Sequence, residues 1–399
     1  MTSPGAPPRP RLVGVDLARA LALVGMMVVH LFPALDPDGS PSAAYLICSG
    51  RASALFAVLA GVGIALGSGG PAPPGQLAPA RRAIVARGLV ILAVGLSLGV
   101  VATGVAVILG YYAVLCLLAL PVLGWGPRRL AAASLVTAVV GPVLSQLLRH
   151  WVPDDSGANL AWGDLGDPAR ALATVLLTGY YPVLTWAAYL FAGLAVGRLE
   201  LGRAAVAGRL VLVGAGLGLG GRLLELAGLA AGGPQALAAG LRDGRLYGEP
   251  PEVIRWTSLY GTTPTGSWWW LGTAAPHSGA APDLVTTTGS ALLVLGLCLL
   301  LTGRVSGWGA APLRALAAAG AGTLSLYSLH VLALAVATDA GHPQQARPGL
   351  ALAANVVLAV VLALAWGAPR RRGPLERVAA GAAAAGRTLG RPGGTRVPQ

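Results

Sequence analysis

The sequence predicts an all-α protein, a polytopic membrane bundle of about ten transmembrane helices with both termini in the cytoplasm. Hydrophobic residues make up 55% of the 399 residues, charged residues only 11%, and the mean hydropathy is +0.69. A soluble domain carries roughly 25% charged residues. The 58 glycines and 30 prolines lie among apolar runs without a Gly-X-Y period, which excludes collagen and a disordered chain.

Each span needs about 20 predominantly apolar residues. Ten segments qualify: 12–33, 44–68, 83–103, 105–125, 130–148, 178–198, 204–224, 283–303, 314–338 and 348–367. The first is not a cleaved signal peptide, because its long apolar run contains Asp16 and Arg19 and no small-residue cleavage site follows it. We expect one transmembrane domain over residues 1–377, with an outer loop at about 226–282. A disordered cytoplasmic tail is expected at 378–399.

The charge distribution predicts the orientation of these spans. The chain carries 28 basic residues, all arginine, against 15 acids, which gives a net charge of +13. With the amino terminus inside, the inner segments hold 18 arginines and 2 acids, and the outer segments hold 6 arginines and 11 acids. Arginine accumulates on the cytoplasmic side of membrane proteins. The basic excess therefore reflects topology and does not indicate nucleic-acid binding.

The first span holds three candidate functional residues, Asp16, Arg19 and His30. An ionisable group inside a span costs about 2.5 to 3.5 kcal/mol on insertion scales, so each one suggests a function. At about 100° per residue all three face one side, with Arg19 and His30 about 16 Å apart along the axis. Asp16 and Arg19 are spaced to pair. The alternative is that this pair is merely neutralised near the interface and that His30 snorkels.

The histidines indicate where acid–base chemistry is expected. All five fall in the outer half of the predicted topology: His30, His150, His277, His330 and His342. Histidine is the side chain best suited to proton transfer near neutrality. His150 and His342 lie in polar loops and are expected to be solvated. His330, one turn from Tyr327, needs a buried hydrogen-bond partner, and His277 precedes a span. The alternative for His330 is a purely structural role, and the alternative for His277 is that it is an ordinary loop residue.

Other polar residues lie at a similar depth. Arg51 opens the second apolar stretch and needs a carboxylate or a substrate anion as its partner. Tyr181 begins a span in TGYYPVLTW, where aromatic residues usually form the interfacial belt. The candidate substrate-binding residues are Asp16, Arg51, Tyr181, His277 and Tyr327. The three cysteines have no ligand spacing, so the sequence predicts neither a disulfide framework nor a metal site.

Six segments resemble membrane acyltransferases of the heparan-alpha-glucosaminide N-acetyltransferase-like group and the related YeiB-like bacterial membrane proteins. They are RLVGVDLARALALVGMMVVH from Arg11, GRASALFAVLAGVGIAL from Gly50, VILGYYAVLCLLALP from Val107, TGYYPVLTWAAYLFAGLAVGRL from Thr178, GTLSLYSLH from Gly322 and GPLE from Gly373. Their order along the chain carries the resemblance, which covers most of it apart from the outer loop and the tail.

The resemblance implies transfer of an acyl group, acetyl being the expected one, from cytoplasmic acyl-CoA to an acceptor outside the cytoplasm. The acceptor would be a hydroxyl or amine of a glycan or lipid-linked sugar, and the protein would lie in the bacterial cytoplasmic membrane. His30 and His330 are then the candidate catalytic residues, with His30 a general base or a nucleophile. Membrane lipid is an expected partner, and the resemblance is compatible with a homodimer.

The CoA phosphates suit guanidinium groups, and the candidates to bind them are Arg19, Arg81, Arg82 and Arg87. The 16 Å between Arg19 and His30, about the length of eleven helical residues, suits a ligand with an extended pantetheine arm. The alternative for Arg81, Arg82 and Arg87 is that they only anchor the cytoplasmic end of a helix.

Two other classes of protein fit part of the pattern. A transporter or flippase also has many spans with glycine and proline breaks and buried charges. It usually carries an internal repeat, and the sequence shows none. A non-catalytic membrane scaffold would use the buried charges only to fix helix packing.

Overall fold

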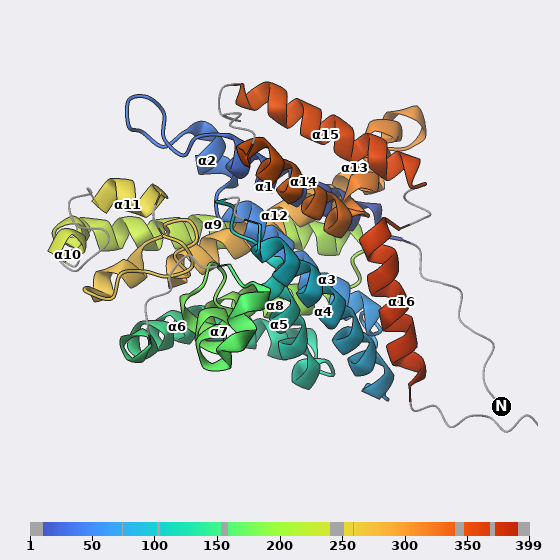
Figure 1. The fold of residues 1–399 in the computed structure, drawn as a ribbon, viewed down its shortest axis with the longest axis horizontal. Coiled ribbons are helices and arrows are strands. Elements are labelled where there is room, and N and C mark those ends of the chain that lie inside the picture. The colour runs from blue at the N-terminus through green and yellow to red at the C-terminus, as the bar shows by residue number, and fades with distance from the viewer. Residues whose placement is uncertain are drawn as a thin grey trace, which may run out of the picture.

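A computed structural model describes residues 11–73, 75–101, 104–152, 159–239, 251–257, 259–339, 347–367 and 372–389. Over these residues the chain is helical and contains no strand beyond one isolated bridge between Leu35 and Pro41 (Figure 1). The prediction of an all-α bundle is confirmed.

The first nine α-helices are α1 (Val13–Leu31), α2 (Ala43–Cys48), α3 (Arg51–Gly67), α4 (Ala78–Gly99), α5 (Leu109–Val122), α6 (Pro127–Leu148), α7 (Pro168–Ala173), α8 (Val183–Gly197) and α9 (Ala204–Ala230). The others are α10 (Gly233–Ala239), α11 (Pro251–Thr257), α12 (Ala281–Arg304), α13 (Ala311–Gly320), α14 (Thr323–Asp339), α15 (Pro348–Ala365) and α16 (Pro374–Thr388). Single turns of other types are η1 (Arg149–Trp151), η2 (Trp162–Gly166), the π-turn η3 (Thr174–Thr178), η4 (Trp268–Gly272) and η5 (Gly307–Ala310).

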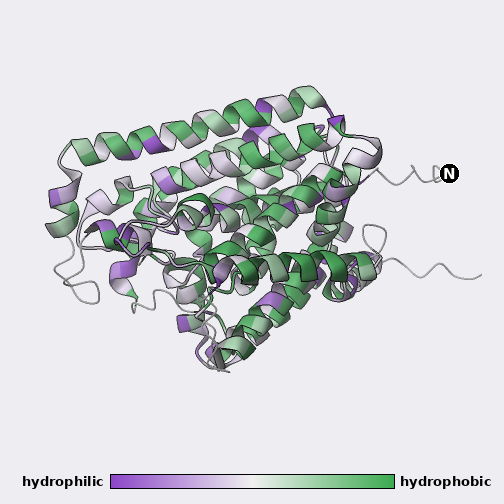
Figure 2. Cartoon of the chain, turned by 90° about the horizontal axis from the view of Figure 1, so that it is seen from above, coloured by the Kyte–Doolittle hydropathy of each residue, from purple (hydrophilic) through white to green (hydrophobic). Residues whose placement is uncertain are grey.

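The described helices support an integral, multi-pass membrane protein. Seven apolar helical segments are long enough to cross a bilayer, and two bent pairs raise the number to nine. One pair joins η3 to α8 at 58°, and the other joins α13 to α14 at 73°. The one predicted span not among these nine, at 105–125, corresponds to α5, which has only 14 residues. Apolar residues dominate along the helices (Figure 2).

The end of the chain differs from the prediction. Disorder was expected from residue 378, but residues 374–388 form α16, which packs along α4 (Figure 1). Alanine and glycine are frequent in this segment, so composition alone suggests a tail. Its apolar residues recur at helical spacing, however, and Ala379 and Gly386 are buried. Residues 390–399 of the predicted tail lie outside the described part of the chain.

Glycine lets the membrane helices approach closely. A Cβ at Gly214 of α9 would lie 2.5 Å from the Leu293 nitrogen of α12, and one at Gly289 of α12 would lie 2.4 Å from the Gly218 nitrogen of α9. Both distances are below van der Waals contact. Small residues at such crossings allow backbone contact and dispersion packing, which drive helix association in lipid.

A buried arginine joins three helix ends at one face of the bundle. Arg198, just after α8, donates to the carbonyl groups of Ala65 at 3.0 Å and Gly70 at 2.9 Å, and also to that of Leu123. These acceptors lie at the carboxyl ends of α3 and α5 or just beyond. The ends of α3, α5 and α8 therefore meet, as the alternating topology predicts for the inner face.

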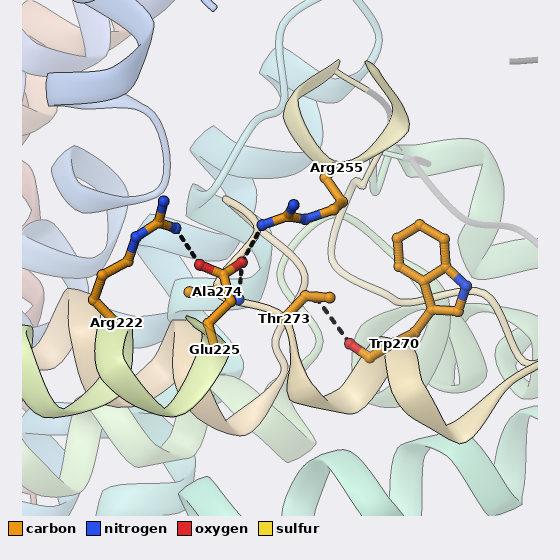
Figure 3. A network of polar contacts seen from close by, with 6 residues as sticks. All are labelled: Arg222, Glu225, Arg255, Trp270, Thr273 and Ala274. Atoms are coloured by element: carbon orange, nitrogen blue, oxygen red, sulfur yellow. Dashed lines mark hydrogen bonds and ion pairs between the residues drawn. The ribbon is translucent and has the colours of Figure 1, made fainter. Parts of the chain in front are cut away.

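At the opposite end, an ion-pair network holds the outer loop (Figure 3). The Glu225 carboxylate of α9 is fully buried and accepts hydrogen bonds from Arg222, Arg255 and the Ala274 N–H. It thereby ties α9 to α11 and to the chain before α12. Part of the predicted loop is thus a folded cap, in which Trp270 is buried while Trp268 is 54% exposed.

We predict that Gly214→Ala lowers the stability of the protein in detergent by about 1–3 kcal/mol, because the added methyl group overpacks the α9–α12 crossing. Gly216→Ala, two residues away on the same helix with nothing within 4 Å of its Cβ, should be neutral or slightly stabilising. Thermal unfolding of both variants provides the measurement. Equal melting temperatures for the two would contradict this account of the crossing.

Candidate functional site

Two histidines from distant parts of the chain meet toward the predicted outer face. Nδ1 of His30 in α1 lies 3.1 Å from Nε2 of His330 in α14. The rings are within 9° of parallel, with centroids 5.3 Å apart, so the hydrogen bond lies close to the plane of both rings. His330 is 3% exposed and His30 is half-buried. The structure therefore brings together the two residues predicted to be catalytic.

An asparagine in α15 gives this contact a direction. Nδ2 of Asn355 donates to the Ala351 carbonyl at 2.8 Å, which turns Oδ1 toward Nδ1 of His330 at 3.0 Å. A neutral imidazole has one N–H and one acceptor nitrogen. His330 therefore donates to Asn355 and accepts from Nδ1 of His30. Nε2 of His30 keeps a free lone pair, as a general base or nucleophile requires.

Asn355 is a site residue that was not predicted from the sequence. A buried partner for His330 was expected, but only ionisable and aromatic groups inside the spans were candidates. The available signal was that Asn355 is the single polar side chain in the apolar helix PGLALAANVVLAVVLALA. A polar residue in lipid must find a partner within the protein, so this position could have been identified as the missing one.

His277 supports the same region from the loop before α12. Its Nε2 accepts the Gly50 N–H at 3.2 Å, its carbonyl accepts the Gly261 N–H at 2.7 Å, and its ring packs against Tyr181. It lies near enough to His30 to interact electrostatically. Its φ of 61° is unusual for a residue other than glycine, and such strain is concentrated at functional sites. Burial lowers the pKa of His277 to about 4, so the ring is neutral at pH 7.

Tyr181 and Tyr327, both predicted to bind substrate, point their hydroxyl groups at the chain itself. Both donate to the Ala106 carbonyl, at 3.1 Å and 3.4 Å respectively. Ala106 belongs to a non-helical segment before α5, and Asn159 also holds this segment by bonding Val107 N–H at 2.7 Å. Irregular backbone inside a membrane protein needs such partners. The two hydroxyl groups therefore anchor this segment.

Asp16 and Arg51 have partners within the protein. Asp16 is 4% exposed and is paired with Arg11 at 2.5 Å and with Arg19 at 3.2 Å, so the predicted Asp16–Arg19 pair is present. Its carboxylate positions Arg19 and is not open to substrate. Arg51 donates to the Leu46 carbonyl and lies in the electrostatic field of Asp283.

A cavity opens between α1, α3, α4, α5 and α16 toward the predicted inner face. It encloses about 1090 Å³, counting the part open to solvent. Its polar lining includes Arg19, Arg87, Arg387, Tyr112 and Glu376. Two of the four arginines predicted to bind CoA, Arg19 and Arg87, therefore line the same cavity. Arg387 of α16 lines it too, although its segment was predicted to be a disordered tail.

The other two predicted arginines face elsewhere. Arg81 donates to the Leu120 carbonyl at 3.1 Å, and Arg82 donates to the Gly386 carbonyl at 3.3 Å. Neither lines the cavity. Arg82 instead fixes α16 against α4. The anchoring alternative thus describes Arg81 and Arg82 better than it describes Arg87.

The segment GPLE has a structural role. Oε1 of Glu376 accepts the N–H groups of Leu324 at 2.7 Å and Ser325 at 3.1 Å, and Oε2 accepts the Ser325 hydroxyl at 2.5 Å. The carboxylate therefore caps the amino terminus of α14, where negative charge is favourable. Through this cap α16 holds the helix that carries His330.

Among the described residues, no group of three or more histidine, cysteine or acidic side chains could hold a metal ion. Cys48, Cys116 and Cys298 are free thiols.

These observations define the class, an integral membrane protein with a hydrogen-bonded histidine pair near one end of α1 and an arginine-lined cavity near the other. The chain belongs to the family described as heparan-alpha-glucosaminide N-acetyltransferase, catalytic, whose model matches residues 11–213. The resemblance found in the sequence motifs is confirmed. The matched region contains Arg19, His30 and Arg87, and it ends before His330 and Asn355. No curated protein matches the chain.

We predict that Tyr181→Phe and Tyr327→Phe each cost about 1 kcal/mol of stability. The double variant should cost more than their sum, because only then does the partly buried Ala106 carbonyl lose both donors. A double-mutant cycle from detergent unfolding measures the difference. Tyr260→Phe is the matched control, since Tyr260 is 43% exposed. Strict additivity would contradict the shared acceptor.

Proposed function

We propose that the protein transfers an acyl group, acetyl being the simplest, from acyl-CoA at the cytoplasmic face to a hydroxyl or amine outside the cytoplasm. The observation that carries this proposal is the layout of α1. This unbroken helix places Arg19 in the inner cavity and His30 in the outer histidine pair, about 16 Å apart along the axis. An extended pantetheine arm would span such a distance, with its charged end at the cavity.

His30 would act as the general base. Its free Nε2 takes the proton of the acceptor hydroxyl or amine as the acceptor attacks the thioester carbonyl. A carbon–oxygen or carbon–nitrogen bond forms, the carbon–sulfur bond breaks, and the proton passes to the leaving thiolate, so that free CoA results. His330 and Asn355 would hold the His30 ring and stabilise its charged form during transfer, as the third group of a catalytic triad does.

The same Nε2 atom would carry the acyl group if the reaction proceeded in two steps. The two routes differ in one observable species. A rapid denaturing quench near neutral pH, applied to enzyme incubated with labelled acyl-CoA without acceptor, leaves label on His30 in the two-step route and none in direct transfer.

The family description names a glucosaminide, so an α-glucosaminide is the first acceptor to test. We further propose that both termini are cytoplasmic and that the protein lies in a bacterial cytoplasmic membrane. The side-dependent arginine excess supports this orientation, and the meeting of the α3, α5 and α8 ends supports the alternation of spans on which it depends. Membrane lipid and a homodimer remain predictions about partners.

A transporter or flippase is the second candidate, because the bent pairs at 58° and 73° resemble the broken helices of alternating-access proteins. The two functions separate experimentally. In proteoliposomes that lack acyl-CoA, a transporter would still move solute or lipid across the membrane. An acyltransferase would be inactive without its donor, and its acceptor would stay unmodified.

We predict that cells expressing the protein gain acylated envelope glycans or lipids, and that His30→Ala reduces them at least about hundredfold by removing the base. Asn355→Ala should reduce them less, since it only releases the His330 ring. Asn355→Asp should restore them, because a carboxylate oxygen still accepts from His330. Mass spectrometry of envelope fractions with and without the gene is the measurement.

Binding of acetyl-CoA in nanodiscs provides the control for folding in this series. All three variants should bind with wild-type affinity, because their side chains lie outside the inner cavity. An active His30→Ala variant, or loss of acetyl-CoA binding together with activity, would contradict the assigned role of His30.

A further inference from the structure

The C-terminal helix α16 forms part of the wall of the inner cavity. The Arg82 guanidinium donates to the Gly386 carbonyl at 3.3 Å, and a Cβ at Gly386 would lie 2.7 Å from the Arg82 carbonyl. One residue further on, Arg387 donates to the Gly67 carbonyl at the end of α3, at 3.3 Å. The close backbone approach and these two hydrogen bonds fix α16 across the ends of α3 and α4.

The charges around the cavity are unbalanced. Arg19, Arg87 and Arg387 all line it, and the lining contains one carboxylate, that of Glu376. Both oxygens of Glu376 are already used in capping α14. Arg87 has no ion-pair partner among the described residues, and the only acceptor that Arg387 meets there is the uncharged Gly67 carbonyl. Of the three, only Arg19 has a carboxylate partner among the described residues, Asp16, which it shares with Arg11.

The positions of these arginines suggest an order along the cavity. Arg387 is exposed and lies beside Gly67 at the carboxyl end of α3. Phe56, about three helical turns earlier in α3, packs against Tyr112 with ring centroids 5.3 Å apart, and both residues line the cavity. A ligand with several negative charges at one end and an apolar arm at the other would place its charges at Arg387 and Arg87.

We propose that α16 is part of the donor site, and that Arg387 with Arg87 binds the phosphate groups of the nucleotide portion of acyl-CoA. This inference rests on the proposed function and extends the donor site beyond the family-model match, which ends at residue 213. Guanidinium groups bind phosphate oxygens through paired, charge-assisted hydrogen bonds. The same helix caps α14 through Glu376, so the donor site and the helix bearing His330 share one support.

The test compares two ligands in calorimetry with the full-length protein in nanodiscs. Acetyl-CoA carries the nucleotide phosphates, and acetyl-pantetheine lacks them. Arg387→Ala should weaken acetyl-CoA binding about tenfold, the loss of one to two charge-assisted hydrogen bonds, and change acetyl-pantetheine binding less than twofold. Arg387→Lys should lie between wild type and Arg387→Ala. Arg377→Ala is the matched control, an exposed arginine of α16 outside the cavity lining.

Three results would overturn the inference: wild-type affinity of Arg387→Ala for acetyl-CoA, equal weakening of both ligands, or an equal effect of Arg377→Ala. If Arg387→Ala does not fold, Arg387→Lys and the salt dependence of wild-type binding decide instead. Affinity for acetyl-CoA that does not fall with salt would then overturn it. Failure of the wild-type protein to bind either ligand would contradict the proposed function itself.

Discussion

Three polar side chains inside an apolar bundle must satisfy one another, and the arrangement of the site depends on this requirement. His30, His330 and Asn355 come from α1, α14 and α15, and each accepts or donates at 3.0–3.1 Å. Because the apolar interior of the bundle offers no water as a partner, a side chain of this set left without a hydrogen bond would cost several kcal/mol. The chain of hydrogen bonds therefore fixes the three helices relative to one another and leaves Nε2 of His30 as the free atom.

The bend between α13 and α14 makes this meeting possible. At 73° it redirects the chain, and the helix that begins after it needs partners for its first N–H groups. Glu376 supplies them from the far end of the chain. The hydrogen-bonded histidine pair thus depends on α16, although α16 lies at the opposite end of the bundle. In the proposed function, α1 and α14, the helices that carry the histidines, connect the two ends of the site.

Much of the fold was predictable because the physics involved is local. The length of an apolar run identifies a span, and each of the ten predicted spans has a helical counterpart. The arginine distribution adds a prediction of their orientation. The pairing of Asp16 with Arg19 also follows from helical spacing. The meeting of His30 with His330 does not, because the two are 300 residues apart and only tertiary packing brings them together. Asn355 was missed because a lone amide carries no charge signal.

The helix at 374–388 was missed for a different reason. Frequent alanine and glycine suggest a tail by composition, but alanine also favours helix, and the packing of α16 on α4 is a tertiary contact that composition does not show. Tyr181 and Tyr327 have the residue type and depth of substrate ligands, yet their hydroxyl groups hold the Ala106 carbonyl. Residue type at a given depth identifies polar groups that need partners. Whether that partner is substrate or backbone depends on geometry.

The central claim is that the donor binds at the inner face and reacts at His30. Its most direct test supplies acetyl-CoA to one face at a time of oriented proteoliposomes that contain envelope acceptor material, and measures release of free CoA thiol. The account predicts release only when acetyl-CoA reaches the face carrying the Arg87 cavity, and none in His30→Ala. Release from the opposite face, or equal release by His30→Ala, would contradict it.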